Sequence, residues 1–430
     1  MKQKRRALRW VRLDNAAKIY PAARRRNWSN VYRQSVTLAE EVDVTVLRSA
    51  LEITVKRFPS IAARLRKGLF WYYLQQVKEA PPIREEYSYP LVYMSDAEMQ
   101  RCALRVIVYR DRIAVELFHA LTDGTGALIF LKNLVAEYLE QKHGIVIPFE
   151  EGIMDRREEP TEEELEDCFP KCAGAVPVSR KDTNAWHMYG DPQRDGFLHL
   201  TCFRLSVKEL LEQAHRYHTT MTVFTSALMM MALIRLQNEK TPAVKRQKPI
   251  KLLIPINLRP LFSCHTLRNF AMYTIPEIDP RLGEYTLEEI CKVIYHKMGS
   301  EFTAKHMSRV IATNVNDEKN PMVRLIPLPL KNMVMKAVFD SVGEKKACLA
   351  LSNLGQVKLP EAMMPYVKRF DFILGVQADA PYNCGMASFG ETVYINFIRN
   401  IRDAELERHF FAVLQELGIS VTVESNRNER

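Results

Sequence analysis

A histidine followed by an aspartate and two glycines is the part of this sequence best suited to chemistry. His119 comes directly after an apolar run that ends at Phe118, and Asp123, Gly124 and Gly126 follow it. A turn at the end of a strand can hold a side chain rigidly at a cleft, and glycine permits backbone angles that other residues resist. A histidine in such a turn can present one ring nitrogen to a substrate while a carbonyl or a carboxylate fixes the other. The residue pattern alone leaves two interpretations open, a general base and a structural histidine with satisfied hydrogen bonds.

The elements on either side of His119 are predicted from hydrophobic periodicity. Strand-like runs cover 104–109 and 113–118, and the charged residues between them predict a hairpin that leads into His119. Apolar residues at helical spacing follow the glycines, from Leu128 to Tyr138. The sequence therefore predicts a strand, a turn and a helix in succession, with His119 in the turn.

Strands and helices alternate along the rest of the chain. Helices are expected from an Asp43 N-cap to Pro59, from a Ser206 capping box to His218, over 222–236, from Thr286 to Gly299 and from Asp403 to Gly418. Strands are expected at 198–205, 251–256, 347–351, 370–376 and 392–397. This alternation predicts an α/β fold with mixed sheets, and 430 residues are enough for two domains.

A charged segment divides the chain into two parts. Acidic and basic residues dominate from 151 to 185, and Pro160 and Pro170 interrupt any long helix there. We therefore expect an N-terminal domain at residues 1–150 that carries His119, a charged linker or crossover at 151–185, and a C-terminal domain at 186–430.

The net charge of +10 favours an anionic partner. Nucleic acid, an anionic membrane surface and a phosphorylated ligand such as CoA all fit this charge. No nucleic-acid motif surrounds the sharpest basic cluster, Arg24-Arg25-Arg26 with Trp28, so it is interpreted as a solvated surface run and no nucleic acid is expected. Gly-rich phosphate loops and dinucleotide fingerprints are also missing, which argues against an ATPase or a dehydrogenase.

The cysteines and the apolar segments predict a protein without metal or membrane span. The eight cysteines are scattered, so neither a disulfide framework nor zinc spacing is expected. Cys168 and Cys172 lie close together but lack a second pair or a nearby histidine, so no metal is expected there. The longest apolar stretch, 223–234, is shorter than the roughly 20 residues that cross a bilayer. The basic N-terminus lacks the apolar core of a secretory signal, and a cytoplasmic location is expected.

The histidine motif resembles a known signature. His119, Asp123 and Gly124 match the HxxxDG pattern of the superfamily that includes chloramphenicol acetyltransferase, nonribosomal-peptide condensation domains, alcohol acetyltransferases, wax ester synthases and polyketide-associated acyltransferases. Further segments are similar to this superfamily: Ile254 to Pro260 with its N-x-R motif, Arg268-Asn269-Phe270, and Leu351 to Gly355. Segments 13–17, Phe58-Pro59 and 68–72 look most like its bacterial alcohol acetyltransferase branch.

The resemblance implies two chloramphenicol-acetyltransferase-like domains with the active site in a channel at their interface. His119 is then the general base that deprotonates an alcohol or amine, which attacks an acyl-CoA thioester without a covalent acyl-enzyme. Asp123 is implied to be structural and to pair with Arg259, and Gly124 to lie near the thioester. Ser352, Asn353 and Asn257 are candidates for substrate or oxyanion contacts.

Two alternatives stay open at this point. A condensation-type enzyme could take its acyl group from a carrier protein, although Phe118 stands where condensation domains carry a second histidine. The fold could also serve as a non-catalytic binding protein.

Trp28, Tyr32, Trp71 and Tyr72 could line a channel, but they are interpreted as aromatic core packing. The acyl chain, the acceptor, the donor carrier, the oligomeric state and the pathway are not specified by the sequence.

Overall fold

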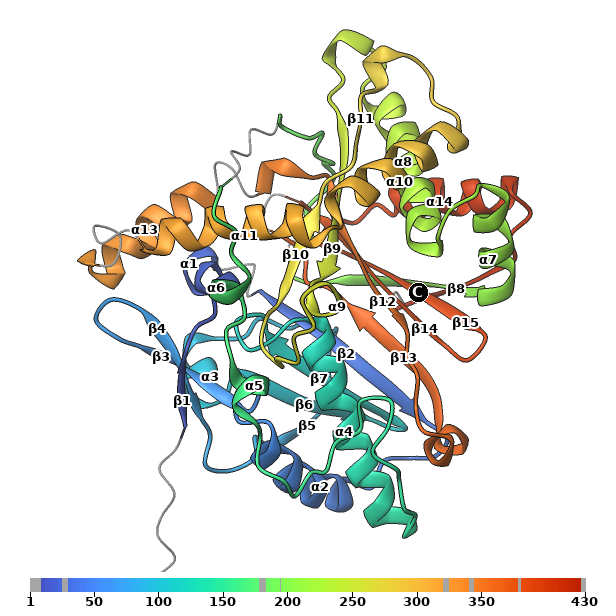
Figure 1. The fold of residues 1–430 in the computed structure, drawn as a ribbon. Coiled ribbons are helices and arrows are strands. Elements are labelled where there is room, and N and C mark those ends of the chain that lie inside the picture. The colour runs from blue at the N-terminus through green and yellow to red at the C-terminus, as the bar shows by residue number, and fades with distance from the viewer. Residues whose placement is uncertain are drawn as a thin grey trace, which may run out of the picture.

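Two mixed β-sheets, each covered by helices, form the body of the molecule (Figure 1). The computed structural model describes residues 9–24, 30–177, 183–193, 195–319, 325–339, 344–377 and 380–426. The expected α/β fold with mixed sheets is confirmed.

The sheet that ends at His119 has five strands in the order β13-β2-β7-β6-β5. Its strands are β2 (Val31–Leu38), β5 (Ile83–Glu85), β6 (Leu104–Tyr109), β7 (Arg112–Phe118) and β13 (Val367–Ile373). The predicted hairpin is present as β6 and β7, which pair antiparallel from Leu104 opposite Leu117 to Tyr109 opposite Arg112. Strand β13 comes from the last third of the chain, so both halves of the sequence contribute to this sheet.

The larger sheet has eight strands in the order β10-β9-β12-β14-β15-β8-β16, with β11 paired to β9. Its strands are β8 (His199–Ser206), β9 (Ile250–Asn257), β10 (Ala271–Thr274), β11 (Glu277–Ile278), β12 (Leu349–Gln356), β14 (Tyr382–Phe389), β15 (Thr392–Arg399) and β16 (Val421–Ser425). Strand β12 runs parallel to both β9 and β14, and the other pairs in this sheet are antiparallel. The sheet is therefore mixed, with its parallel part next to the other sheet's β13.

A small third sheet, in the order β1-β4-β3, lies beside these two. Its strands are β1 (Trp10–Arg12), β3 (Ala63–Lys67) and β4 (Tyr72–Gln76). Figure 1 shows the hairpin of β3 and β4 extending to one side of the molecule, beneath helix α13.

Helices cover the outer faces of the sheets. The helices associated with the first half of the chain are α1 (Ile19–Ala23), α2 (Val44–Arg57), α3 (Asp96–Arg101), α4 (Gly124–His143), α5 (Glu162–Leu165) and α6 (Phe169–Cys172). Those of the second half are α7 (Val207–Arg216), α8 (Met221–Lys240), α9 (Arg259–Phe262), α10 (Leu287–Glu301), α11 (Ala304–Lys319), α13 (Leu328–Val338) and α14 (Glu405–Glu416). The short 3-10 helices are η1 (Ala16–Lys18), η2 (Val244–Arg246), η3 (Pro280–Leu282), η5 (Glu344–Lys346) and η6 (Glu361–Tyr366). In Figure 1, α2 and α4 lie together against the five-stranded sheet, and α7, α8, α10 and α14 gather on the larger one.

The two large sheets meet at a glycine in β14. A Cβ atom at Gly385 would lie 2.2 Å from the main-chain oxygen of Phe372 in β13, a separation that real atoms do not adopt. Glycine is therefore required for β13 and β14 to approach this closely, because it has no side chain to keep them apart. This contact brings the end of β12 next to the turn that holds His119.

Most of the predicted elements around the site are present, with bounds that differ by a few residues. The Asp43 carboxylate caps α2 by accepting from the N–H groups of Thr45 and Val46. Thr286 and Glu289 form the predicted capping box, although α10 continues past Gly299 to Glu301. The structure adds α11 and α13 and the strands β2 and β14, none of which the sequence pattern had indicated.

The expectation about disulfides is wrong. Cys168 and Cys264 form a disulfide bond across 96 residues of sequence. Distance along the chain had suggested that neither cysteine had a partner, but the fold places the charged crossover beside the loop after α9. Among the described residues, no three His, Cys, Asp or Glu side chains gather in a way that could hold a metal ion.

Other surface expectations have mixed outcomes. Arg24 forms an ion pair with Asp96, whereas Arg25, Arg26 and Trp28 lie outside the described residues.

Within the described part of the chain no individual helix has the length and hydropathy to cross a membrane, and only α7 and α8 taken together, across a bend of 82°, meet that measure.

Candidate active site

His119 lies in the turn between β7 and α4, and the residue as a whole is partly buried. Its main-chain N–H donates to the carbonyl oxygen of Asn30 at 2.8 Å, which ties this turn to the start of β2. The ring of Tyr20 stacks on the imidazole with ring centres 4.4 Å apart, and the ring of Tyr32 is tilted against it at 4.9 Å. Two aromatic rings thus pack against the imidazole and fix its plane.

Asn269 and Asp14 determine which nitrogen of His119 carries the proton. Nδ1 of His119 is 3.3 Å from Oδ1 of Asn269, and Nδ2 of Asn269 donates to Oδ2 of Asp14 at 3.3 Å. A carboxylate only accepts, so Asp14 turns the NH₂ group of Asn269 toward itself and the amide oxygen toward His119. That oxygen also only accepts, so Nδ1 of His119 is protonated and Nε2 keeps its lone pair. This is the tautomer that can take a proton through Nε2.

Burial has the largest effect on the charge of His119. It lowers the pKa of the imidazole below the ordinary value of 6.5, and a hydrogen bond within the residue itself, the Asp123 charge and the Asn269 hydrogen bond act in the opposite direction. The lowered pKa keeps the imidazole neutral at neutral pH. A neutral imidazole with a free Nε2 is what a general base requires.

The Asp14 carboxylate is held by a main-chain N–H group and by an arginine. Its Oδ1 accepts from the N–H of Ala17 at 2.7 Å, and its Oδ2 is 3.6 Å from Nη2 of Arg268. Burial raises the pKa of Asp14, and the Arg268 charge opposes that rise. Nearby, burial and the charge of Asp14 raise the pKa of Asp167 to about 6. Arg268 therefore opposes the effect of burial on the carboxyl group that Asn269 contacts.

Asp123 caps α4. Its Oδ1 accepts from the N–H of Gly126 at 3.1 Å, and its Oδ2 accepts from the N–H of Phe270 at 2.8 Å and from Nη1 of Arg259 at 2.9 Å. Burial by itself would raise the pKa of Asp123, but the Arg259 charge and these hydrogen bonds lower it below its ordinary value. The carboxylate is thus a fully bonded anion that joins the turn to the second half of the chain.

Arg259 uses its guanidinium to shape the loop that follows α9. Besides Asp123, it donates from Nε to the carbonyl of Thr266 at 2.8 Å and from Nη2 to the carbonyl of Arg268 at 2.6 Å. Asn257 supports it, because its Oδ1 accepts from both the N–H and Nη1 of Arg259 at 3.1 and 3.2 Å. One buried cation therefore fixes the loop that also carries Asn269.

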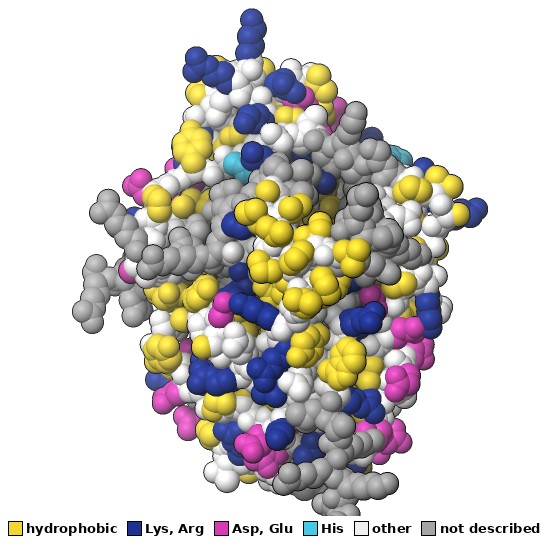
Figure 2. Space-filling view, turned by 90° about the vertical axis from the view of Figure 1, so that its left-hand side faces the viewer, with side chains coloured by type: hydrophobic (Ala, Val, Ile, Leu, Met, Phe, Trp, Pro, Cys, Tyr) yellow, Lys and Arg dark blue, Asp and Glu magenta, His cyan; other side chains and the backbone are white. Residues whose placement is uncertain are grey.

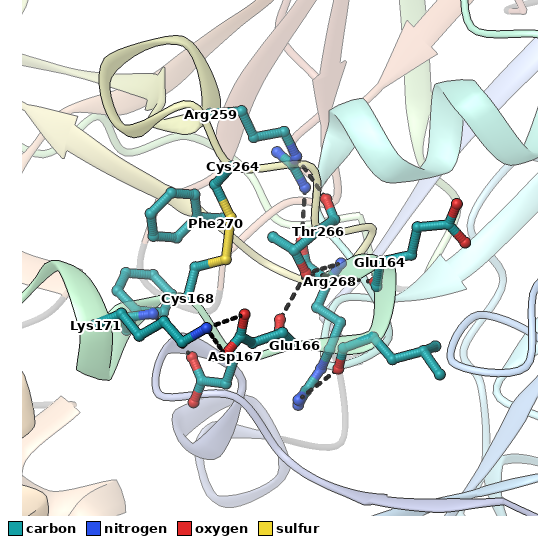
Figure 3. The surroundings of a disulfide bond; sticks show 12 residues. Glu164, Glu166, Asp167, Cys168, Lys171, Arg259, Cys264, Thr266, Arg268 and Phe270 are labelled. Atoms are coloured by element: carbon teal, nitrogen blue, oxygen red, sulfur yellow. Dashed lines mark hydrogen bonds and ion pairs between the residues drawn. A yellow bond between two sulfur atoms is a disulfide. The ribbon is translucent and has the colours of Figure 1, made fainter. Parts of the chain in front are cut away.

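The charged crossover packs against the same loop (Figure 3). Thr266 donates from its hydroxyl to the carbonyl of Glu166 at 2.6 Å, and the N–H of Leu267 donates to the carbonyl of Glu164 at 2.8 Å. Figure 3 shows the Cys168–Cys264 disulfide next to these contacts and beside Phe270. The crossover is therefore part of the scaffold around His119 and not a loose connection.

The two glycines of the turn are needed for different reasons. A Cβ at Gly126 would lie 2.0 Å from Oγ1 of Thr122 and 2.6 Å from the main-chain oxygen of Leu267, so no side chain fits there. A Cβ at Gly124 would lie 2.9 Å from the end of the Leu354 side chain, which can move. Gly126 thus permits the close contact between the turn and the loop, and Gly124 lies against the end of β12.

The predicted site residues divide into two groups. His119, Asp123, Gly124, Arg259 and Asn257 are brought together, and the expected ion pair between Asp123 and Arg259 is present. Asn353 instead donates to Oγ1 of Thr222 at 3.0 Å and accepts from the N–H of Gly355 at 2.7 Å. Ser352, its neighbour in β12, is partly buried opposite Gly385.

Sequence reasoning missed three residues that touch His119 or support its contact, namely Asn269, Asp14 and Tyr20. Two of them, Asp14 and Asn269, lie in the segments 13–17 and 268–270, which resemble the superfamily. The resemblance had assigned these two residues no role. No sequence pattern indicated a role for Tyr20. Nothing in a lone tyrosine after a short polar segment indicates that its ring will stack on a histidine far along the chain.

Known structures of the same architecture cover nearly the whole chain. TRI101 of F. graminearum, solved with ethyl coenzyme A, is 12% identical over 97% of this chain and 100% of its own, with a TM-score of 0.61. The condensation domain of the Monacolin K polyketide synthase MokA is 11% identical over 96% and 98%, with a TM-score of 0.60. Polyketide synthase associated protein 5 from Mycobacterium tuberculosis is 14% identical over 94% and 96%, with a TM-score of 0.58.

The chain has the CoA-dependent acyltransferase fold. No protein-family model matches the sequence, and no curated protein does. At this level of identity the likeness establishes the acyltransferase fold and leaves the reaction to be argued from the site. In this chain the fold places His119, Asp123 and Arg259 where the five-stranded sheet, the crossover and the loop after α9 meet.

Proposed function

We propose that this protein transfers an acyl group, most simply acetyl, from acyl-CoA to an alcohol or an amine. The observation that carries the proposal is the contact between Nδ1 of His119 and Oδ1 of Asn269, which leaves Nε2 to accept a proton. Two of the similar structures are of TRI101 with coenzyme A or ethyl coenzyme A bound, and a third is the trichothecene 15-O-acetyltransferase TRI3, which together support acyl-CoA as the co-substrate.

In the proposed reaction Nε2 of His119 takes the proton of the acceptor hydroxyl or amine. The acceptor oxygen or nitrogen then bonds to the thioester carbonyl carbon and forms a tetrahedral oxyanion. Collapse of this intermediate breaks the carbon–sulfur bond, and the proton on His119 goes to the departing CoA thiolate. Because the acceptor is itself the nucleophile, no covalent acyl-enzyme is formed.

The remaining site residues hold the base in place or face the thioester. Asp123 and Arg259 keep the turn and the loop together, so we assign them positioning roles. Gly124 packs against Leu354, and its place near the thioester rests on the resemblance. Ser352 is the better oxyanion candidate because the amide of Asn353 is used by Thr222 and Gly355. Asn257 supports Arg259, which argues against the substrate contact first expected of it.

The test is a panel of acyl-CoA donors with alcohols and amines, read by release of free CoA thiol. Wild type should turn over at least one pair, and His119→Ala should lose roughly 10²- to 10⁴-fold of that rate, the range that a general base supplies. His409→Ala is the matched control, because this half-buried histidine pairs with the exposed Glu239, and neither residue was assigned to the site. Full activity in His119→Ala would remove His119 from the reaction.

A carrier-protein donor is the second candidate. It is favoured by the likeness to polyketide synthase associated protein 5 and to a condensation domain, and the net charge of +10 suits an acidic carrier protein. The same acyl group presented on CoA and on a carrier protein distinguishes the two donors by kcat/KM. Tight CoA binding with no turnover for any pair would instead favour a non-catalytic binding protein of this fold.

The three-part division at 1–150, 151–185 and 186–430 and the cytoplasmic location stay predictions. The Cys168–Cys264 disulfide is typical of an oxidising compartment, which argues against the cytoplasm. Fractionation of the native cells, followed by mapping of the free and bonded cysteines, decides the location.

A further inference from the structure

Helix α13 carries its apolar side chains on the outside. Leu330, Met333 and Val334 are 54%, 65% and 54% exposed, whereas Lys331 is 2% exposed. Residues three and four positions apart lie on the same side of a helix, so the three apolar side chains form one stripe. A surface helix normally turns such a stripe toward the core. In α13 the arrangement is inverted, and the stripe faces away from the protein.

The inverted orientation is fixed by contacts between the polar side of α13 and the hairpin of β3 and β4. Nζ of Lys331 donates to the carbonyl of Phe70 at 2.9 Å and lies 3.4 Å from the centre of the Trp71 ring. Nδ2 of Asn332 donates to the hydroxyl of Tyr72 at 2.9 Å. Trp71 was expected to pack in the core, but it is only partly buried and supports the helix instead. The apolar stripe is therefore held outward by contacts on the opposite side of α13.

The hairpin and the segment before α13 extend the apolar surface. Leu69, at the tip of the hairpin, is 74% exposed, and Leu325 is 72% exposed. The N–H of Leu328 donates to the carbonyl of Leu69 at 3.0 Å, so the tip lies against the start of α13. We call the five exposed side chains the apolar patch: Leu69, Leu325, Leu330, Met333 and Val334. An apolar surface of this kind on a folded protein marks a site of interaction.

Three arginines stand on the outer face of the small β1-β4-β3 sheet. Arg64 and Arg66 flank Leu65, which is 7% exposed and belongs to the core. Successive side chains of a strand point to opposite faces, so both arginines lie on the outer face. Arg12 of β1 and Arg66 of β3 both lie opposite Tyr73 of β4, which places Arg12 on the same face.

A neutral amide aligns two of these arginines. Oε1 of Gln75 accepts from Nε of Arg64 at 3.0 Å and from Nε of Arg66 at 3.2 Å. An amide carries no charge, so it orients the two guanidinium groups without neutralising them. Over the residues that the structure describes, no Asp or Glu side chain forms an ion pair with Arg12, Arg64 or Arg66. The outer face of this sheet therefore attracts an anion.

The apolar patch and basic side chains share one side of the molecule. In Figure 1 the β3–β4 hairpin and α13 both extend to the left. Figure 2 faces that side and shows hydrophobic side chains at its centre with Lys and Arg side chains beside them. A partner that matches this side must offer both negative charge and an apolar layer.

An anionic phospholipid bilayer has both properties. Its headgroups carry negative charge, and apolar side chains that pass the headgroups reach the acyl chains. A nucleic acid or a free phosphorylated ligand offers charge without an apolar layer. A second copy of the chain, related by a twofold axis, would cover the apolar patch but would also bring arginines close to arginines. The charge of this surface thus favours the bilayer.

We propose that the apolar patch, together with Arg12, Arg64 and Arg66, docks the protein onto the surface of an anionic phospholipid bilayer. The apolar patch enters the boundary between headgroups and acyl chains, and the guanidinium groups bind lipid phosphates. The contact is peripheral, with α13 in the plane of the interface. It does not depend on acyl transfer at His119.

Sedimentation with vesicles tests the proposal. One set of vesicles is phosphatidylcholine alone, and the other contains phosphatidylserine as well. Binding should be at least about 10-fold tighter to the phosphatidylserine vesicles, because the three guanidinium groups then meet opposite charge. Added salt should weaken this binding, since it screens the charges. His119→Ala should bind as wild type does, which keeps this test apart from that of the acyl transfer.

Two pairs of substitutions test the arginines at equal net charge. Arg64→Gln with Arg66→Gln should weaken binding to the phosphatidylserine vesicles by about 10-fold or more. Lys208→Gln with Arg216→Gln removes the same charge from exposed positions on α7 and should leave binding nearly unchanged. Figure 1 shows α7 on the far side of the molecule from α13.

Two further pairs test the apolar patch. Met333→Gln with Val334→Gln should weaken binding by about 10-fold or more, because two side chains no longer gain from leaving water. The control is Val244→Gln with Leu282→Gln, at apolar side chains that are 52% and 78% exposed in η2 and η3. A tryptophan placed by Met333→Trp should be quenched by brominated acyl chains in the vesicles, which locates the apolar patch in the bilayer.

Several results would overturn the proposal. Absence of binding, or equal binding to both kinds of vesicle, would remove the role of the arginines. An equal loss in the α7 control would mean that net charge, and not this surface, draws the protein to the bilayer. Self-association that Met333→Gln with Val334→Gln abolishes, without binding to vesicles, would make the apolar patch an interface between copies of the chain.

Discussion

Oδ1 of Asn269 lies 3.3 Å from Nδ1 of His119, although 150 residues separate the two in the sequence. The contact joins the turn after β7 to the loop after α9, and Asp14 holds the amide in the orientation that makes Asn269 an acceptor. A residue that contributes no proton of its own therefore decides which nitrogen of His119 is available to a substrate.

Asn269→Ala should lower kcat by roughly 10- to 100-fold, less than loss of the general base itself, because the imidazole would no longer be held in one tautomer. The Asn269 hydrogen bond raises the pKa of His119. Its removal should therefore also move the midpoint of the pH profile of kcat/KM downward. Asn238→Ala, at an exposed asparagine on α8, is the control. A lower rate with an unshifted midpoint would argue for a purely structural role.

The pH profile of the wild type follows from the burial of His119. Since burial lowers the pKa of this residue below 6.5, kcat/KM should rise with pH through a midpoint below 6.5 and be level at neutral pH. The folded-state pKa lies below the unfolded one, so the contribution of His119 to stability is present above 6.5 and is lost as the pH falls through the folded value. Urea unfolding of wild type and His119→Gln between pH 5 and 8 measures this difference. A midpoint above 6.5 would contradict the structure.

Arg259→Ala should destabilise the fold as well as slow the reaction. It leaves the buried Asp123 carboxylate without its cation, which costs about 3 to 5 kcal/mol. The control is Arg235→Ala, because its ion pair with Glu416 lies at the surface and such pairs contribute about 0 to 1 kcal/mol. The free energy of unfolding from urea titrations compares the two. An equal loss of unfolding free energy in both variants would mean that the buried Asp123–Arg259 pair contributes no more to stability than a surface ion pair.

Gly126→Ala should be among the most damaging small substitutions in the chain. The added methyl group would lie 2.0 Å from Thr122 Oγ1 and 2.6 Å from the Leu267 oxygen, so the turn and the loop must separate. Gly299→Ala, in the interior of α10 where a Cβ has open space, should instead stabilise the protein by roughly 0.5 to 1 kcal/mol. The melting temperature should thus fall in Gly126→Ala and rise in Gly299→Ala, although both substitutions add the same methyl group.

The disulfide should stabilise the loop after α9, which carries Asn269 and contacts Arg259. Cys264→Ser should lower the free energy of unfolding by about 2 to 4 kcal/mol, because the unfolded chain is no longer closed across 96 residues. Cys172→Ser is the matched control, since Cys172 is a free cysteine at the end of helix α6, which begins directly after Cys168. A reducing agent should lower the melting temperature of wild type and leave that of Cys264→Ser unchanged. A wild type that is insensitive to reduction would argue that the bond is not formed in solution.

Local sequence determined the elements next to the site. The hairpin of β6 and β7, the Asp43 cap of α2, and the turn at Asp123 all depend on residues close together in the chain, which is why their patterns could be interpreted one segment at a time. The histidine and its aspartate were found in the same way. The partner of Asp123 came from the resemblance and not from any local pattern.

Only the tertiary structure decided what surrounds His119. The Asn269 amide, the Tyr20 ring, the disulfide between Cys168 and Cys264, and the addition of β13 to the five-stranded sheet all join segments far apart in sequence. Neither periodicity nor spacing encodes such contacts, because they arise when the sheets pack together and the crossover is drawn against the loop after α9. The same packing turned Lys331 inward and left the apolar side of α13 exposed.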